Sequence, residues 1–191
     1  AIQEMGYESP MPVQEEVIPF LLGDDNDVIA LAQTGTGKTA AFGLPILQKI
    51  DVTTYHPQAL VLCPTRELCL QIADDLNDYS KYIDNLKVLP VYGGSSIESQ
   101  IKTLKRGVHV VVATPGRLLD LMNRKTVDLS LVKNVIMDEA DEMLNMGFTD
   151  SINAILAEVP ENRNMLLFSP PCRKRIANIT KEVHEEIRRR S

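Results

Sequence analysis

The chain has 191 residues and a net charge of −6, with 44% hydrophobic and 24% charged residues, which excludes a disordered polypeptide and suits one α/β domain with a single apolar core. The negative charge excludes a broad basic groove that would coat nucleic acid. Five Tyr, four Phe and no Trp provide few aromatic platforms for stacked bases, so any nucleic acid must be held mainly in another way.

The first predicted elements surround a glycine-rich turn. An apolar helical stripe over residues 13–21 and a short apolar strand over residues 28–31 precede the sequence Ala-Gln-Thr-Gly-Thr-Gly-Lys-Thr at residues 32–39. Between a strand and a helix, glycines let backbone N–H groups surround an anion at the positive end of the helix dipole. Lys38 supplies charge for the outer phosphates and Thr39 a hydroxyl for Mg²⁺. We expect nucleoside triphosphate binding; the alternative is a turn that only joins a strand to a helix.

The rest of the chain alternates between short apolar strands and amphipathic helices. We predict strands over residues 59–63, 87–92, 109–113, 134–137 and 165–168, and helices over residues 64–76, 97–105, 114–122 and 176–187. This alternation predicts a parallel sheet with helices on both faces. The sequence contains no internal repeat, and we expect one domain over residues 1–191.

An acidic segment, Asp-Glu-Ala-Asp at residues 138–141, directly follows a predicted apolar strand. Ligands of parallel sheets bind beyond the carboxyl ends of the strands, so we expect Asp138 to meet Lys38 at one edge of the sheet. Asp138 is expected to hold Mg²⁺ through its water shell and Glu139 to orient the attacking water. The alternative, a solvated acidic helix start, accounts for Asp141 more readily than for Asp138.

Six fragments, in this order and spacing, resemble motifs of the N-terminal RecA-like domain of DEAD-box RNA helicases. They are residues 6–14 (Gly-Tyr-Glu-Ser-Pro, ending at Gln14), 32–39, 64–68 (Pro-Thr-Arg-Glu-Leu), 93–94 (Gly-Gly), 114–117 (Thr-Pro-Gly-Arg) and 138–141. The resemblance covers nearly the whole chain. It implies a RecA-like P-loop domain that binds ATP, Mg²⁺ and RNA.

The resemblance also implies roles for individual residues at the nucleotide. Gln14, which on local evidence is only a solvated first-turn glutamine, would bind the adenine edge and select ATP over GTP, and Tyr7 would pack near the base. The other expected contacts with ATP are Gln33, Thr34, Gly35, Thr36, Gly37, Lys38, Thr39 and Ala40. The expected catalytic residues are Lys38, Asp138 and Glu139, with Mg²⁺ held at Thr39 and Asp138 largely through water.

An RNA face that contacts the phosphate backbone without reading base identity is implied in the same way. Its residues are Pro64, Thr65, Arg66, Gly94, Thr114, Gly116 and Arg117. Turns that open helices present N–H groups and hydroxyls to phosphates, and arginines add charge, which explains how an acidic domain can hold RNA. The alternative is that the two threonines only cap helices and the two arginines are ordinary surface residues.

One motif departs from the family pattern. The family has Ser-Ala-Thr where this chain has Ser169-Pro170-Pro171. In the family this motif couples hydrolysis to duplex separation, and the resemblance assigns that coupling to Ser169 and Asp141. Two prolines remove two backbone donors, and the threonine hydroxyl is lost. We expect nucleotide binding to survive and coupling to be damaged, unless the prolines only begin the closing helix.

The resemblance implies an ATP-dependent RNA helicase of which this chain is the N-terminal half. Because the second RecA-like domain is absent, we expect the isolated chain to be nearly inactive. The alternatives are a non-catalytic ATP-gated RNA clamp or scaffold, which the changed motif favours, and a P-loop ATPase that acts on DNA or protein. No apolar run approaches the ~20 residues of a membrane span, and three cysteines cannot pair completely. We therefore expect a cytoplasmic monomer whose partners are RNA and the second domain.

Overall fold

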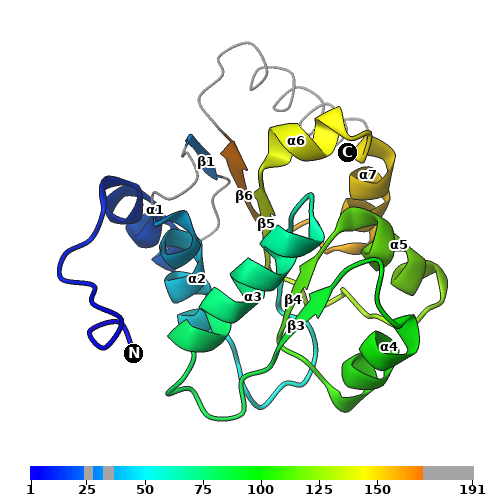
Figure 1. Cartoon of the computed structure of the whole chain (residues 1–191), viewed down its shortest axis with the longest axis horizontal. Coiled ribbons are helices and arrows are strands. Elements are labelled where there is room, and N and C mark those ends of the chain that lie inside the picture. Colours follow the sequence, from blue (N-terminus) through cyan, green and yellow to red (C-terminus); the bar gives the residue numbers. More distant parts are fainter. Residues whose placement is uncertain (24–27, 32–36, 170–191) are drawn as a thin grey trace.

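The computed structural model describes residues 1–23, 28–31 and 37–169. Residues 24–27, 32–36 and 170–191 lie outside this description and are drawn in grey in Figure 1. The expected phosphate-binding turn over residues 32–36 and the expected closing helix over residues 176–187 are therefore not among the described residues.

The centre of the described chain is a parallel sheet of six strands. They are β1 (Val28–Leu31), β2 (Ala59–Leu62), β3 (Val88–Val91), β4 (Val110–Ala113), β5 (Asn134–Asp138) and β6 (Asn164–Ser169). Their order across the sheet is β1-β6-β5-β2-β4-β3 (Figure 1). Met137 of β5 pairs with Leu167 of β6 and with Leu62 of β2, and Leu62 pairs in turn with Ala113 of β4. The segments that leave these strands therefore start from one edge of the sheet.

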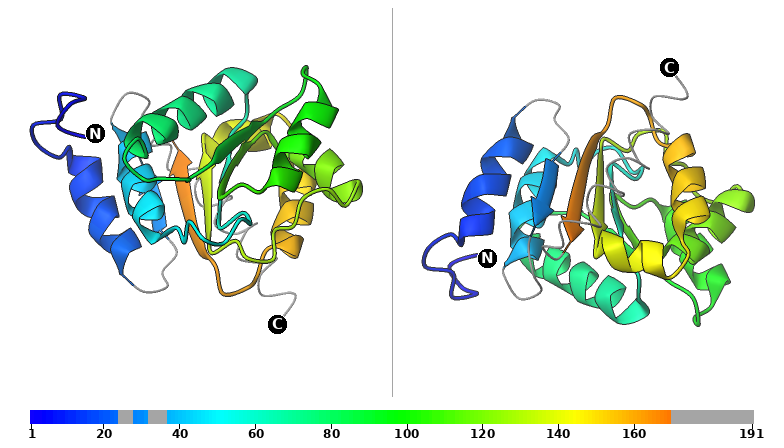
Figure 2. Two further views of the ribbon diagram at one scale, coloured as in Figure 1. Left: turned by 90° about the horizontal axis from the view of Figure 1, so that it is seen from below. Right: turned by 90° about the horizontal axis from the view of Figure 1, so that it is seen from above.

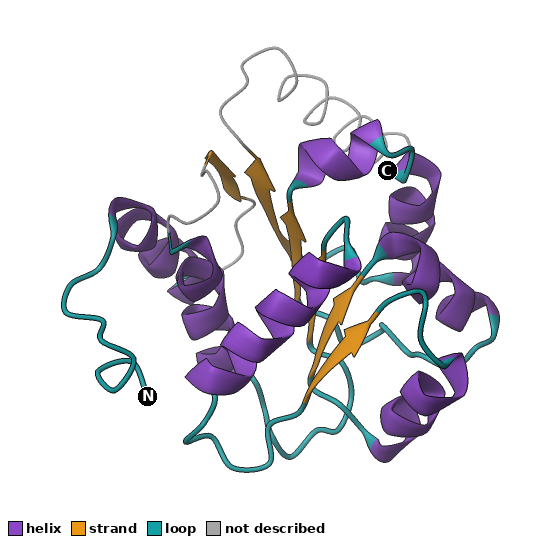
Figure 3. Cartoon of the chain, in the orientation of Figure 1, coloured by secondary structure: helices purple, strands orange, loops and turns teal. Residues whose placement is uncertain are grey.

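Helices connect the strands and cover both faces, as Figure 3 shows by colour. They are α1 (Pro12–Leu22), α2 (Lys38–Lys49), α3 (Arg66–Tyr79), α4 (Ile97–Arg106), α5 (Pro115–Asn123), α6 (Ala140–Asn145) and α7 (Thr149–Glu158). The chain crosses the sheet from β1 through β2 to β3 and then returns through β4 and β5 to β6. Because such crossovers are right-handed, the outward helices α2 and α3 cover one face and the returning helices α4 to α7 cover the other (Figure 2).

Each face of the sheet contributes to its own apolar core. In β2, Ala59 and Val61 pack with α1, α2 and α3, whereas Leu60 and Leu62 pack with the helices of the other face. Successive strand residues point to opposite faces, so a strand covered on both sides is apolar throughout. All four residues of β2 are buried. The predicted alternation of strands and helices and the predicted parallel sheet are confirmed, whereas α6 and α7, between β5 and β6, are not among the predicted helices.

Helix α2 approaches α3 closely at Gly43. A Cβ atom on Gly43 would lie 2.7 Å from Cδ2 of Leu76, a separation that packed atoms do not adopt. The missing side chain lets the two helices pack side by side, which fixes the start of α2 against the face of α3. None of the helices in the described ranges is long and apolar enough to cross a lipid bilayer.

Candidate functional site

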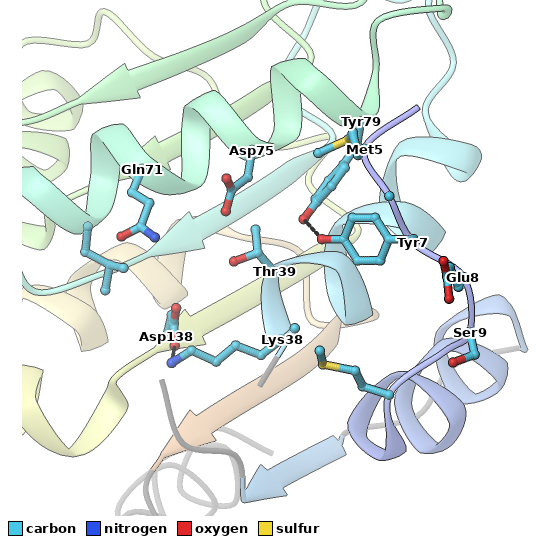
Figure 4. A pocket seen from close by; sticks show the side chains of 14 residues that line it. Met5, Tyr7, Glu8, Ser9, Lys38, Thr39, Gln71, Asp75, Tyr79 and Asp138 are labelled. Carbon is cyan, nitrogen blue, oxygen red and sulfur yellow. Dashed lines mark hydrogen bonds and ion pairs between the residues drawn. The ribbon is translucent and has the colours of Figure 1, made fainter. Parts of the chain in front are cut away.

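A buried ion pair joins the start of α2 to the end of β5. Lys38 is the first residue of α2, and its Nζ lies 2.7 Å from Oδ1 of Asp138, the last residue of β5 (Figure 4). The two residues are 100 positions apart in the chain, and they meet at the carboxyl edge of the sheet as the sequence predicts. Desolvating both charges offsets much of their attraction, so a buried pair is weak evidence of a stabilising role. Its geometry instead holds the Lys38 ammonium group at the start of α2, at the carboxyl edge of the sheet.

Glu139 follows Asp138 in a backbone conformation that is rare for a residue with a side chain. Its φ of 53° and ψ of 49° lie in the left-handed region, which costs free energy for a residue with a Cβ atom and which Asn85 and Lys125 also enter. The N–H of Glu139 donates to Oδ1 of Asp138 at 3.0 Å. Burial, and then the neighbouring charge of Asp138, raise the pKa of the Glu139 carboxyl above its ordinary value. The site therefore makes Glu139 a better proton acceptor than an exposed glutamate.

The two carboxylate oxygens of Asp138 are unequally satisfied. Oδ1 accepts from both Lys38 and Glu139, whereas the buried Oδ2 has no hydrogen-bond partner among the described residues. Such an orphan acceptor is costly, and the waters around a divalent cation would supply donors to it. The described residues contain no group of three or more His, Cys, Asp or Glu side chains that could enclose a metal. The residues present therefore fit Mg²⁺ held largely through water and phosphate, with the Thr39 hydroxyl nearby.

A cavity of about 640 Å³ opens beside this ion pair. Its walls come from the segment before α1, the start of α2 and one face of α3 (Figure 4). The lining residues are Met5, Gly6, Tyr7, Glu8, Ser9, Met11, Gly37, Lys38, Thr39, Leu68, Gln71, Asp75, Tyr79 and Asp138. Its volume is within the range of small-molecule sites. Of the expected nucleotide contacts, Tyr7, Gly37, Lys38 and Thr39 line it, whereas Ala40 is buried in α2 and residues 33–36 are not described.

Gln14 ties the segment before α1 to the start of α2. Its Oε1 accepts from the N–H of Met11 at 2.9 Å, and its Nε2 donates to the carbonyl oxygen of Gly37 at 3.1 Å. The side chain is buried, so the expectation of a solvated first-turn glutamine from local evidence is wrong. Gly37 has a φ of +72°, and a Cβ there would lie 2.5 Å from Nε2 of Gln14. Only glycine fits at this point of the turn.

Three residues of α3 that the sequence analysis did not single out also line the cavity. Gln71, Asp75 and Tyr79 are spaced by four and share one face of the helix, a pattern visible in the sequence. The hydroxyls of Tyr79 and Tyr7 lie 3.0 Å apart, with the rings edge to face. Burial raises the pKa of Asp75, and a hydrogen bond from the Thr39 hydroxyl opposes that rise. Tyr7 therefore sits against a polar wall of α3.

The residues expected to contact RNA follow the adjacent strands β2, β4 and β3 and lie at the same edge of the sheet as Asp138. Their exposure differs. Arg66, Gly94 and Gly116 are exposed, Thr65, Thr114 and Arg117 are half-buried, and Pro64 is buried. The structure brings these segments together, with the Pro64 ring turned away from solvent.

The two threonines behave differently at the helix starts. Thr65 caps α3, because its Oγ1 accepts from the N–H of Leu68 at 3.2 Å. Thr114 makes no side-chain cap hydrogen bond to α5 within the described part of the chain, so the expectation that it caps this helix is wrong. The helix begins with Pro115, whose fixed φ suits a first helical position without such a cap.

The two expected coupling residues lie near the acidic segment. Ser169 ends β6 and is buried, and the preceding Phe168 pairs with Asp138. Asp141 is half-buried, and its buried Oδ1 has no hydrogen-bond partner among the described residues, which disfavours the alternative of a fully solvated helix start. Residues 170 and 171, which carry the departure from Ser-Ala-Thr, are outside the described ranges.

Proteins with similar sequences place this chain in a family. The family model for DEAD/DEAH box helicase matches residues 11–178. The ATP-dependent RNA helicase DeaD of Mycobacterium tuberculosis is 53% identical over 180 residues, which are 93% of this chain and 32% of that protein. DeaD of Escherichia coli K12 is 46% identical over 97% of this chain and 29% of its own length. The chain thus spans about a third of the length of these curated relatives.

Solved structures give the same result for the fold. A DEAD box protein from the hyperthermophile Methanococcus jannaschii superposes with a TM-score of 0.87 and 43% identity, over 94% of this chain and 49% of that one. Yeast Dbp5, in a complex with Nup159, Gle1, IP6 and ADP, gives a TM-score of 0.85 and 32% identity, over 95% of this chain and 48% of that one. The parallel sheet with helices on both faces is the expected RecA-like P-loop fold. The chain belongs to the DEAD/DEAH box helicase family.

Proposed function

We propose that this chain is the ATP-binding half of an ATP-dependent RNA helicase. The observation that carries the proposal is the buried contact between Lys38 and Asp138 at the carboxyl edge of the sheet, beside the 640 Å³ cavity. The relatives at 46–53% identity are named ATP-dependent RNA helicases, which supports it. The proposal includes a second RecA-like domain in the full-length protein, a monomeric state and a cytoplasmic location.

ATP binding would use the remaining hydrogen-bonding capacity of this site. Lys38 would exchange Asp138 for the outer phosphates. Among the described residues, each polar atom of the Gln14 amide makes one contact to the protein, which leaves one donor and one acceptor for adenine. That pair matches the N7 acceptor and N6 donor of adenine, whereas guanine presents two acceptors at the same edge. Gln14 would therefore favour ATP over GTP while holding the start of α2.

Hydrolysis would depend on Glu139. Glu139 directly follows Asp138, and its carboxylate would orient the attacking water and accept its proton, which its raised pKa favours. Mg²⁺, held by Thr39, Asp138 and the phosphates, would neutralise the charge that develops on the phosphate oxygens. We expect the 191-residue chain alone to hydrolyse ATP barely, because arginines from a second domain are worth about 10³–10⁵ in rate in related phosphoryl-transfer enzymes.

RNA would be held by its backbone at the neighbouring edge of the sheet. Arg66 and Arg117 supply positive charge, and the N–H groups at the starts of α3 and α5 face the same side. Contacts of this kind carry no sequence information. The RNA face, comprising Thr65, Arg66, Gly94, Thr114, Gly116 and Arg117 with Pro64 beneath it, would therefore bind single strands with little sequence preference.

The test is RNA-stimulated ATP hydrolysis by the full-length protein that contains this chain. We expect single-stranded RNA to stimulate the wild type more than DNA does. Glu139→Gln should lower kcat about 10²–10⁴-fold while ATP still binds, because only the base is removed. Glu142→Gln is the matched control, because it changes an exposed carboxyl on α6, the short helix that follows Glu139. It should change neither kcat nor ATP binding. The proposal is contradicted if RNA does not stimulate ATP hydrolysis, or if Glu139→Gln hydrolyses ATP as fast as the wild type.

A non-catalytic ATP-gated RNA clamp is the second candidate, and the sequence Ser169-Pro170-Pro171 favours it. Duplex unwinding by the full-length protein, with and without the double change Pro170→Ala and Pro171→Thr, separates the two. Unwinding that appears only with the double change supports a helicase with damaged coupling. RNA binding that depends on ATP, without unwinding by either form, supports the clamp.

A further inference from the structure

Gln100 lies beneath the RNA face and connects three of its elements. Its side chain belongs to α4 and is only 5% exposed. Nε2 donates to the carbonyl oxygen of Tyr92 at 3.1 Å and to Oγ of Ser95 at 3.0 Å. Oε1 accepts from Nη1 of Arg117 at 3.1 Å. One buried amide thus joins the end of β3, the loop before α4 and the start of α5.

The partners of Gln100 are also joined to each other. Nη1 and Nη2 of Arg117 each donate to the carbonyl oxygen of Ser95 at 3.1 Å. Both N–H groups of the Gln100 amide are in use, and its oxygen faces a guanidinium that can only donate. If the Gln100 amide were flipped, its NH₂ group would face the N–H donors of Arg117 and the hydrogen bond would be lost. The orientation of Gln100 is therefore fixed by its surroundings.

The loop that Gln100 holds lies between the two arginines of the RNA face. On one side, Arg117 contacts Ser95. On the other, the guanidinium carbon of Arg66 lies 5.0 Å from the centre of the Tyr92 ring, and a Cβ on Gly94 would be 3.7 Å from Nη1 of Arg66. Gly94 has a φ of +80°. The shape of the loop over residues 92–95 therefore decides where both arginines sit.

We propose that Gln100 is a positioning residue for RNA binding: it holds the loop over residues 92–95 and the Arg117 guanidinium in the arrangement that presents Arg66 and Gly94 to a phosphate backbone. The inference rests on the proposed function of the RNA face. Gln100 itself is too deeply buried to contact RNA, so it acts through its three partners. No residue of α4 is among those that line the nucleotide cavity, so ATP affinity should not depend on Gln100.

Gln58 offers a matched control at the opposite end of the sheet. Its side chain also makes three hydrogen bonds within a loop, to the N–H of Asp51 at 2.9 Å, to the carbonyl of Asp51 at 2.8 Å and to the carbonyl of Thr54 at 2.9 Å. Gln58→Ala therefore removes the same side chain and the same number of hydrogen bonds as Gln100→Ala. Gln58 is half-buried whereas Gln100 is buried, so urea denaturation of both variants is measured beside RNA binding to separate lost stability from lost positioning.

The experiment measures binding of a labelled oligouridylate to the full-length protein by fluorescence anisotropy, with a non-hydrolysable ATP analogue, over a series of salt concentrations. Gln100→Ala should weaken RNA binding about tenfold, because two contacts to the loop and one to Arg117 are lost, and should leave affinity for a fluorescent ATP analogue unchanged. Gln58→Ala should change neither affinity. Gln100→Glu retains the acceptor for Arg117 but loses both donors to the loop, and it should weaken RNA binding as Gln100→Ala does.

The salt dependence provides a readout that lost stability would not move. Each lost phosphate contact to single-stranded RNA lowers the magnitude of the negative slope of log K against log salt by about 0.7. Gln100→Ala removes no charge, so a shallower slope means that an arginine has left its phosphate. Combining it with Arg117→Ala should add less than the sum of the two single effects, because both act on one loop.

The outcomes separate this inference from the proposed function. If Gln100→Ala retains the RNA affinity and the salt slope of the wild type, the positioning role is overturned and the proposed function is left intact. Equal losses in Gln100→Ala and Gln58→Ala also overturn it, since the effect is then one of stability. A wild type that does not bind RNA with the ATP analogue overturns the proposed function, and the role of Gln100 with it.

Discussion

The two ends of the same six strands differ in how fully their polar side chains are paired. At the carboxyl end, Oδ2 of Asp138 and Oδ1 of Asp141 are buried without hydrogen-bond partners among the described residues. Glu139 between them has a left-handed backbone and a raised pKa. These features cost free energy, and the fold tolerates them because the surrounding sheet and helices are well packed.

At the amino end, the buried side chains of His109, Asn134 and Asn164 have hydrogen-bond partners. Nδ1 of the buried His109 accepts from the N–H of Lys87 at 3.0 Å, and its other ring nitrogen lies 3.1 Å from the carbonyl oxygen of Val52. The side chain of Asn164 donates to that of Asn134 at 3.2 Å. The difference indicates that the acidic segment at the carboxyl end keeps carboxylate oxygens available for ligands, whereas His109, Asn134 and Asn164 at the amino end stabilise the fold.

The largest expected effect is that of Lys38→Ala at the carboxyl end. Because the variant loses the cation that meets the phosphates, we expect ATP hydrolysis by the full-length protein to fall about 10²–10³-fold. Steady-state hydrolysis assays measure this. Lys49→Ala is the matched control, since Lys49 lies at the other end of α2, where its Nζ donates to the carbonyl of Gly23 at the surface. Equal activity of the two variants would remove Lys38 from the phosphate site.

The next effect is at the amino end, where His109→Ala should change stability alone. The N–H of Lys87 and the carbonyl of Val52 lose their buried partner, so we expect the free energy of unfolding to fall by about 3 kcal/mol. Urea denaturation measures the loss, and His56→Ala, at an exposed position, should cost little. A changed KM for ATP in folded His109→Ala would contradict the claim that His109 at the amino end only stabilises the fold.

A smaller effect is expected from Gln14→Ala, because Gln14 both supports the turn at Gly37 and is proposed to contact adenine. The variant loses the contacts to Met11 and Gly37 and one partner for adenine, so ATP affinity should fall about tenfold. GTP affinity should change less, so the preference for ATP should shrink. Titration of fluorescent ATP and GTP analogues tests this. An unchanged ratio of the two affinities would mean that Gln14 only supports the turn.

The smallest effect concerns Asp51, in a loop at the amino end. The hydroxyl and N–H of Thr53 and the hydroxyl of Thr54 hold the pKa of Asp51 below its ordinary value. Because the pKa is lower in the folded state, this contribution to stability is complete above the unfolded value, about 3.9, and is lost as pH falls through the folded value. In Asp51→Asn, urea midpoints should fall slightly at neutral pH and match the wild type in acid. ATP hydrolysis should be unchanged.

The sequence predicts much of the difference between the two ends of the sheet, because local patterns show where the strands lie and which residues follow each strand. The meeting of Lys38 and Asp138 follows from two apolar strands whose carboxyl ends share one edge of a parallel sheet. The helix cap at Thr65 follows from residue type and position alone. Both are consequences of periodicity and local chemistry, which a single sequence contains.

The residues that sequence analysis missed depend on how helices are rotated against their neighbours. Gln100 looks like a solvated residue of an amphipathic helix, and only the approach of α5 turns it into a buried link to Arg117. Asp75 and Tyr79 become part of the cavity only because Gly43 lets α2 pack against α3. The left-handed backbone of Glu139 is likewise imposed by its surroundings and not by residue type.

Amide hydrogen exchange of the full-length protein, alone and with a non-hydrolysable ATP analogue and single-stranded RNA, tests the division between the two ends most directly. The account predicts new protection at residues 37–39, 64–66, 92–95 and 114–117, and none at the amino-end loops over residues 51–58, 107–109 and 125–128. Protection concentrated at the amino-end loops, or spread equally over both ends, would contradict it.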